Sequence, residues 1–254
     1  PILSADSLDR LSEASAQVFQ ELTGYDRVLV FRFDDEGRGE VIAERRRDGI
    51  ASCLGQHFGD AQVPPKAHQL IERNRIRHLV DADEPPVPIR PARSPLTGLP
   101  LDLSRSTWRS LSALHLQFLG RLGVRGALVA SLLVGGRLWG LIVCHHRAPR
   151  FVHYPVRVAC ALLAEAVATR ISGLEAALQA RAEAGILGLE ARLVESIARH
   201  GDWTPALLED PAALLRPVGA SGAVLAYEGK RLKVGETPED ARLSEILAWL
   251  DGQP

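Results

Sequence analysis

The sequence predicts an α/β fold of the α+β kind, with a central antiparallel sheet, flanking helices and a long connecting helix that leads to a second, partial α/β domain. Two hairpin patterns predict the sheet: residues 27–33 and 39–44 alternate around a polar turn, and the apolar runs 128–134 and 137–144 flank Gly135 and Gly136. A helical stripe that begins near residue 155 predicts the long helix. We expect helices to cover one face of the sheet.

Composition indicates a globular chain that is long enough for one large or two medium domains. The 254 residues carry a net charge of −1 with both signs interspersed, which gives no support to a nucleic-acid or membrane partner. No apolar run reaches the length of a membrane span, and no signal-peptide pattern opens the chain. The three cysteines lack metal-ligand spacing, so a reducing cytoplasm is the simplest setting. Because Met is absent, we interpret the chain as a fragment.

The first elements follow from local patterns. Residues 4–22 carry apolar side chains at helical spacing, and Thr23 with Gly24 ends that pattern as a helix C-terminus does. Residues 27–33 are rich in Val and Phe and predict a strand, and residues 34–37 predict a turn into the second strand. The pattern of residues 45–58 is ambiguous.

The middle of the chain combines short elements with a long loop. Pro64 and Pro65 predict the start of a helix that runs over residues 66–75, and residues 78–80 predict a short strand. Residues 83–100 hold six prolines, so they predict a loop that cannot pair as a central strand. Long loops inside compact domains are usually functional.

The C-terminal third changes to helical spacing. Apolar residues from 156 to 197 predict a long helix that packs against a partner copy, although a helix that covers the sheet of its own domain would show the same stripe. Residues 203–215 predict a short helix, residues 223–227 and 231–234 a hairpin, and residues 238–250 an amphipathic helix. This tail predicts the start of a second α/β domain.

Residues 108–119 bring a guanidinium, two hydroxyls and an imidazole into a mostly apolar segment. A packed core has little use for Arg109 or His115, because an unpaired buried polar group costs several kcal/mol. If a helix begins near Ser112, then His115, Phe118 and Leu119 share one face. That face suits a pocket for a large, flat, acidic ligand, but a surface helix with a solvated Arg and His fits the same residues.

This segment, Arg-Ser-x-Ser-x-x-His-x-x-Phe-Leu followed by Gly-Val, resembles the bilin-binding GAF domain of phytochromes. Three more segments resemble the same family in the same order: residues 25–33, 73–77 and 138–146, the last of which reads Leu-Trp-Gly-Leu-Ile-Val-Cys-His-His. The resemblance is close over residues 20–175, and a weaker likeness to the start of a PHY domain follows. It implies a GAF domain at 1–172, a connecting helix at 173–200 and a partial PHY-like domain at 201–254.

The resemblance implies a site for a biliverdin-type bilin. Arg77 and Arg109 match the arginines that hold the two propionates, since a guanidinium meets a carboxylate in two charge-assisted bonds. His115 matches the histidine near the inner pyrrole nitrogens, and His145 the one near the D-ring carbonyl. Further residues at matching positions, several of which are alternatively plain core residues, are Phe31, Cys53, Phe58, Gln62, Val63, Ser110, Ser112 and Phe118.

The sequence also departs from the family pattern. The family motif Pro-Ala-Ser-Asp-Ile-Pro reads Gly-Asp-Ala-Gln-Val-Pro here, so Gln62 replaces an aspartate that serves the pyrroles. Ala127 and Val129 stand where two serines help to hold a propionate, and Leu114 stands where plant and cyanobacterial members have the bilin-linking cysteine. Bacterial members attach the bilin through an upstream PAS domain, which this chain lacks. Any bilin is therefore expected to bind without a covalent link, unless Cys53 or Cys144 has been recruited.

The resemblance implies a photosensory module that relays red and far-red light to an output domain outside the chain, with a homodimer formed through the long helices. No phosphate loop, nucleophile elbow or metal motif supports an enzyme. Two alternatives remain open. One is a phytochrome-derived domain that has lost the bilin and acts as a light-independent, dimeric, thiol-based sensor, and the other is a GAF domain for another small molecule such as a cyclic nucleotide.

Overall fold

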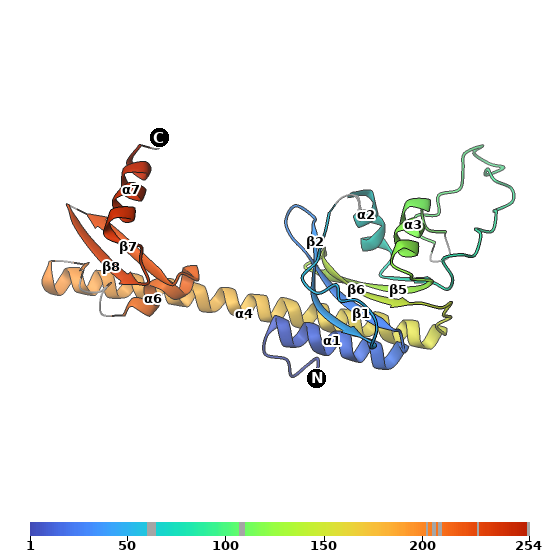
Figure 1. The fold of residues 1–254 in the computed structure, drawn as a ribbon, viewed down its shortest axis with the longest axis horizontal. Helices are drawn as coiled ribbons and strands as arrows, with labels where there is room; N and C mark the ends of the chain where they lie inside the picture. Colours follow the sequence, from blue (N-terminus) through green and yellow to red (C-terminus); the bar gives the residue numbers. More distant parts are fainter. Residues whose placement is uncertain are drawn as a thin grey trace. The chain divides into compact units, whose positions relative to one another are not determined.

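A computed structural model describes residues 1–59, 65–106, 110–201, 203–204, 207, 210–227 and 229–252 (Figure 1). The chain divides into two compact units, Pro1–Leu174 and Glu175–Pro254. The predicted domain limits at residues 172 and 200 stay predictions. No helix among the described residues is long and apolar enough to cross a membrane.

The first unit is built on a six-stranded sheet whose neighbouring strands are all antiparallel, in the order β3-β2-β1-β6-β5-β4. The strands are β1 (Arg27–Phe33), β2 (Gly39–Arg46), β3 (His57–Phe58), β4 (Ile76–Leu79), β5 (Gly126–Val134) and β6 (Arg137–His146). The four main predicted strands are confirmed. Strand β3 lies in the segment without a clear pattern, and β4 begins two residues earlier than predicted, which brings Arg77 into the sheet.

Helices lie on both faces of this sheet, so the prediction that they cover one face is wrong. The helices of this unit are α1 (Leu8–Thr23), α2 (Pro65–Arg73), α3 (Ala113–Arg121) and the first part of α4 (Tyr154–His200). Helices α1 and α4 lie on one side of the sheet, and α2 and α3 lie on the other (Figure 1).

The main core fills the side of α1 and α4. Val28 and Val30 point from β1 to this side, because successive strand residues alternate between faces, and they pack with Phe19 of α1 and Val167 of α4. The hydroxyl of Ser7 accepts a hydrogen bond from the first turn of α1, and Gly24 ends the helix with a left-handed φ of 65°. This core holds one face of the sheet against α1 and α4.

The opposite face carries a smaller apolar cluster, formed by Leu29, Val41, Cys53, Ile71, Leu141 and Val143. Partly buried aromatic rings, among them Phe31 and Phe58, pack against it. The two faces therefore differ: one carries the main core, and the other carries a smaller cluster bordered by aromatic rings.

The second unit confirms the predicted hairpin and last helix. It contains α6 (Pro211–Leu215), a 3₁₀ turn (Arg216–Val218), β7 (Gly222–Tyr227), β8 (Lys230–Gly235) and α7 (Asp240–Asp251). Within the range 203–215 predicted as one helix, Thr204, Leu207 and α6 (Pro211–Leu215) are helical, whereas Asp210 is not. The long helix α4 is continuous through Gly185 and Gly188.

Candidate functional site

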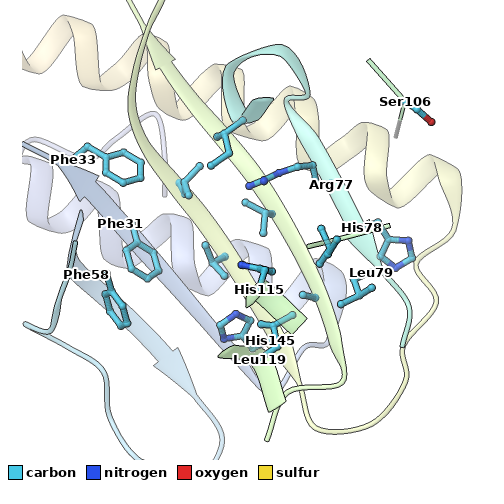
Figure 2. A pocket seen from close by; sticks show the side chains of 16 residues that line it. Phe31, Phe33, Phe58, Arg77, His78, Leu79, Ser106, His115, Leu119 and His145 are labelled. Atoms are coloured by element: carbon cyan, nitrogen blue, oxygen red, sulfur yellow. The ribbon is translucent and has the colours of Figure 1, made fainter. Parts of the chain in front are cut away.

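A cavity of about 140 Å³ lies between the sheet and helices α2 and α3 (Figure 2). Its volume is roughly ten times the space that one water needs. Five of the predicted site residues line it, and they come from β1, β3, β4, α3 and β6: Phe31, Phe58, Arg77, His115 and His145. Figure 2 shows the phenylalanine rings along one side of the cavity, with Arg77 on the other side and the two histidines between them.

Strand register explains why these residues meet. Arg77 lies opposite Val129 in the β4–β5 ladder, and His145 lies opposite Ala127 in the β5–β6 ladder. All four residues line the cavity. Since side chains directly opposite in an antiparallel pair share a face, the ladder brings residues far apart in the sequence onto one wall.

Helix α3 presents His115 and Leu119 to the cavity, four residues apart and thus on one face. The hydroxyl of Ser112 accepts a hydrogen bond of 3.3 Å from the backbone N–H of His115 and caps the helix. Ser110 is exposed and is not among the residues that line the cavity. The predicted helix start near Ser112 is correct, because Ser112 is the N-cap residue of α3.

Aromatic rings build a continuous wall. The ring of Phe58 meets that of Phe31 edge-on at a centroid distance of 5.4 Å and that of Phe118 at 6.1 Å. The ring of Phe118 lies 6.1 Å from that of His115. Phe118 thus supports the wall from behind, and this arrangement suits a flat, conjugated ligand.

The electrostatics of the cavity favour an acidic ligand. Burial, and then the nearby Arg77, lower the pKa of His115. Burial, and then Arg27 and His115, lower the pKa of His145 to about 3. Both imidazoles are therefore neutral at pH 7, and Arg77 is the one fully charged side chain among the described residues that line the cavity. A mostly apolar cavity with one cation suits a ligand with a large apolar body and a carboxylate.

Sequence reasoning assigned no role to Arg27, which is 6% exposed. Its guanidinium donates to Cys53 Sγ at 3.2 Å and to the carbonyl of Ala51 at 3.4 Å, and it lies 3.2 Å from Nδ1 of His145. The sequence did contain a signal for a role of Arg27, because it is a charged residue in a largely apolar strand. Leu29 and Phe31 follow it by two and four residues, so all three side chains lie on the same face of the strand.

The segments around Arg27 and His145 lie against each other. Arg27 pairs with His145 and Val28 with Cys144 in the β1–β6 ladder. The thiol of Cys144 faces the core on the side of α1 and α4, whereas Cys53 lies on the side of the cavity. Cys53 lines a neighbouring cavity that shares His145. Gln62, Val63 and Arg109 lie outside the described residues, and the described part of the chain contains no group of three metal-ligating side chains.

Comparisons with protein families match the two units in order. A model of the GAF domain matches residues 7–173, and a model of the phytochrome region matches residues 186–254. The chain belongs to the GAF domain family. Its GAF domain is followed by a phytochrome region, as the ordered sequence motifs predicted.

Several curated proteins match nearly the whole chain. The GAF–PHY chain is 33% identical over 240 residues to cyanobacterial phytochrome B of Nostoc sp., covering 94% of this chain and 32% of that protein. It is 37% identical over 247 residues to a bacteriophytochrome of Xanthomonas campestris pv. campestris, covering 96% of this chain and 39% of that one. The chain thus spans about a third of the length of these relatives.

A solved structure has the same fold. The crystal structure of bacteriophytochrome RpBphP3 from the photosynthetic bacterium R. palustris matches with a TM-score of 0.79 and 33% identity, covering 98% of this chain and 50% of that chain. The predicted fold class, a GAF domain with an antiparallel sheet, a long helix and a PHY-like part, is therefore confirmed.

Proposed function

We propose that this GAF–PHY chain binds a biliverdin-type bilin in the cavity between the sheet and helices α2 and α3. The bilin would supply the absorption of red and far-red light, and an output domain outside the chain would carry the signal. Relatives named phytochrome and bacteriophytochrome support a light-sensing role. The observation that carries the proposal is that Arg77, His115 and His145 line one cavity together with aromatic rings.

The two arginines have the same role in this proposal. Arg77 and Arg109 hold the propionate groups through charge-assisted hydrogen bonds, each of which contributes about 1.5–3 kcal/mol. His115 contacts the inner pyrrole nitrogens, and His145 contacts the D-ring carbonyl. The rings of Phe31 and Phe58 pack against the conjugated system, and Gln62 and Val63 belong to the same site by their match to the family motif.

Within residues 1–254 the bilin is proposed to be held without a covalent link. Leu114 has no thiol, and Cys144 lies in the core on the opposite face of the sheet. Cys53 is the one cysteine on the face of the cavity, but it is 6% exposed and its sulfur accepts a hydrogen bond from Arg27. Acid denaturation followed by extraction should therefore release the bilin from the protein.

A titration with biliverdin tests the function. The purified protein should produce an absorption band to the red of free biliverdin, and Arg77→Ala should weaken binding about tenfold or more through the lost charge-assisted bonds. Arg75→Ala is the matched control, because Arg75 is two residues away and pairs with Glu165 of α4 on the other side of the sheet.

Two outcomes would contradict the proposal at different levels. A wild-type protein that gives no red-shifted band has no bilin site, and the light-independent sensor would replace the present proposal. If the wild type binds and Arg77→Ala binds equally well, then the assignment of Arg77 is wrong although the chain is a bilin protein.

The proposal also includes assembly. We propose that the chain forms a homodimer through α4, between an upstream PAS domain and a downstream output domain of a longer protein, and that this segment itself performs no catalysis. Support comes from the apolar side chains that α4 leaves exposed in its later turns: Leu178, Ile186, Leu187, Val194 and Ile197.

A further inference from the structure

We propose that Arg27 is a positioning residue, which holds His145 as the neutral tautomer with its proton on Nε2 and so makes His145 a hydrogen-bond donor to the ligand. The part that concerns a ligand rests on the proposed bilin function. The part that concerns the tautomer is a property of the protein alone and can be tested without a bilin.

The sheet imposes the contact between the two residues. Arg27 and His145 lie directly opposite each other in the β1–β6 ladder, so their side chains share one face. Both are 6% exposed, and Nη2 of Arg27 lies 3.2 Å from Nδ1 of His145. A contact between two buried side chains on neighbouring central strands has little freedom to rearrange.

The hydrogen-bond donors of Arg27 determine the tautomer of His145. A guanidinium has only donors and stays protonated in proteins, so Nδ1 of His145 must be the acceptor of this hydrogen bond. A neutral imidazole carries one proton, which must then reside on Nε2. Within the described part of the chain no hydrogen-bond partner of Nε2 is found, and His145 lines the cavity.

The other partners of Arg27 hold the guanidinium in position. It donates to Cys53 Sγ and to the carbonyl of Ala51, and the loop that carries both is tied to β2, because the backbone N–H of Cys53 donates to Glu44 Oε1 at 3.2 Å. Among the described residues Arg27 forms no ion pair with a carboxylate. Its charge therefore acts directly on His145.

The surrounding groups all oppose a charged His145. Arg27 faces it from β1, His115 faces it from α3, and Arg77 acts on His115 from β4. Cys53 contributes a thiol beside Arg27, and no carboxylate among the described residues acts on the His145 ring to offset this repulsion. Burial and the Arg27 charge lower the pKa of His145 to about 3. The imidazole therefore keeps one proton across the physiological range.

Nitrogen NMR of the bilin-free chain tests the proposal. The ring nitrogens are labelled in histidine, and the signals of His145 are assigned by their loss in His145→Asn. The wild type should show a protonated Nε2, an unprotonated Nδ1 and no titration above about pH 4. In Arg27→Gln a second tautomer should appear, and the titration midpoint should rise by roughly one pH unit because a nearby cation is gone.

Two variants serve as controls. Arg27→Lys keeps a charged donor and should preserve the wild-type tautomer in larger part than Arg27→Gln does. Arg32→Gln makes the same substitution on the same strand, where Arg32 is exposed and pairs with Glu40, and it should leave the His145 signals unchanged.

The position of the His145 proton in the wild-type spectrum tests the proposal even if Arg27→Gln fails to fold. A proton on Nδ1 of His145 would overturn the proposal, and so would a folded Arg27→Gln whose His145 signals and titration equal those of the wild type. With biliverdin, Arg27→Gln should shift the red band relative to wild type while Arg32→Gln does not. A failure of the wild type to bind would remove the proposed function and leave the tautomer result standing.

Discussion

Arg77 lies directly opposite Val129 in the β4–β5 ladder, and both side chains line the cavity. By the resemblance to phytochromes, Val129 stands where a serine helps to hold a propionate, so we expect a hydroxyl at this position to assist Arg77. We expect Val129→Ser to lower the dissociation constant for biliverdin by about three- to tenfold, because a hydroxyl beside Arg77 adds one hydrogen bond to a carboxylate. The measurement is a titration followed by the red absorption band.

The matched control for that prediction is Val143→Ser. Val143 pairs with Val129 from β6, the neighbour of β5 on the side away from β4. It lines the same cavity but is not paired with Arg77. Val143→Ser should not lower the dissociation constant. If both substitutions change the dissociation constant equally, then Val129 does not lie near a bound carboxylate.

Gly140 should tolerate no side chain. A Cβ at this position would lie 2.1 Å from the carbonyl oxygen of Phe31, where Gly140 pairs with Arg32 at the end of the β1–β6 ladder. We expect Gly140→Ala to lower the free energy of unfolding by about 2 kcal/mol or more, since the two strands must separate locally. Urea denaturation measures this loss. Gly173→Ala is the control: nothing lies within 4 Å of an added Cβ there, and the change should stabilise α4 slightly.

The cysteines should react with alkylating reagents at different rates. Cys144 and Cys160 have no exposed surface; burial raises the pKa of the Cys160 thiol to about 11 and also raises the pKa of Cys144. We expect iodoacetamide to label both at least about tenfold more slowly than Cys53, which lines a cavity, because the thiolate is the reacting species. Mass spectrometry of peptides gives the rates. Native Cys144 labelled as fast as Cys53 would contradict the burial of β6.

Acidification should destabilise the fold through His145. Its pKa is about 3 in the folded chain and roughly 6.5 when unfolded, so between these values the unfolded state binds more protons. Stability therefore falls as the pH drops through this range, and we expect His145 to account for a loss of about 3 kcal/mol between pH 7 and 4. Denaturation of wild type and His145→Gln at both pH values measures it. An equal loss in the variant would show that other groups cause the effect.

Dimerisation should depend on the exposed apolar side chains of α4. Ile186 is 54% exposed, and a charge there would be buried at a helix–helix interface. We expect Ile186→Glu to weaken the dimer at least about tenfold. Sedimentation measures the change, with Ala177→Glu as a control that adds the same charge at an exposed position nine residues before Ile186, on the opposite side of the helix. A wild type that stays monomeric at high micromolar concentration would contradict the proposed assembly.

Local patterns in the sequence were sufficient for much of the fold. Alternation in residues 27–33 predicted β1 with its bounds, and the Gly135 and Gly136 turn predicted the β5–β6 hairpin, because both signals lie within a few neighbouring residues. The cavity residues Arg77, His115 and His145 were identified through ordered motifs that resemble one family. Spacing alone could not assign them, since a solvated Arg and His fit the same pattern.

Tertiary structure decided which of these side chains meet. Arg27 and His145 are 118 residues apart in the sequence, and only the β1–β6 register places them opposite each other. The register also separates Cys144, which faces the closed core, from its neighbour His145, which faces the cavity. The sequence by itself determined the periodicity of each strand. Which face became a core and which a cavity depended on the helices that pack there, because a period of two is the same for both faces.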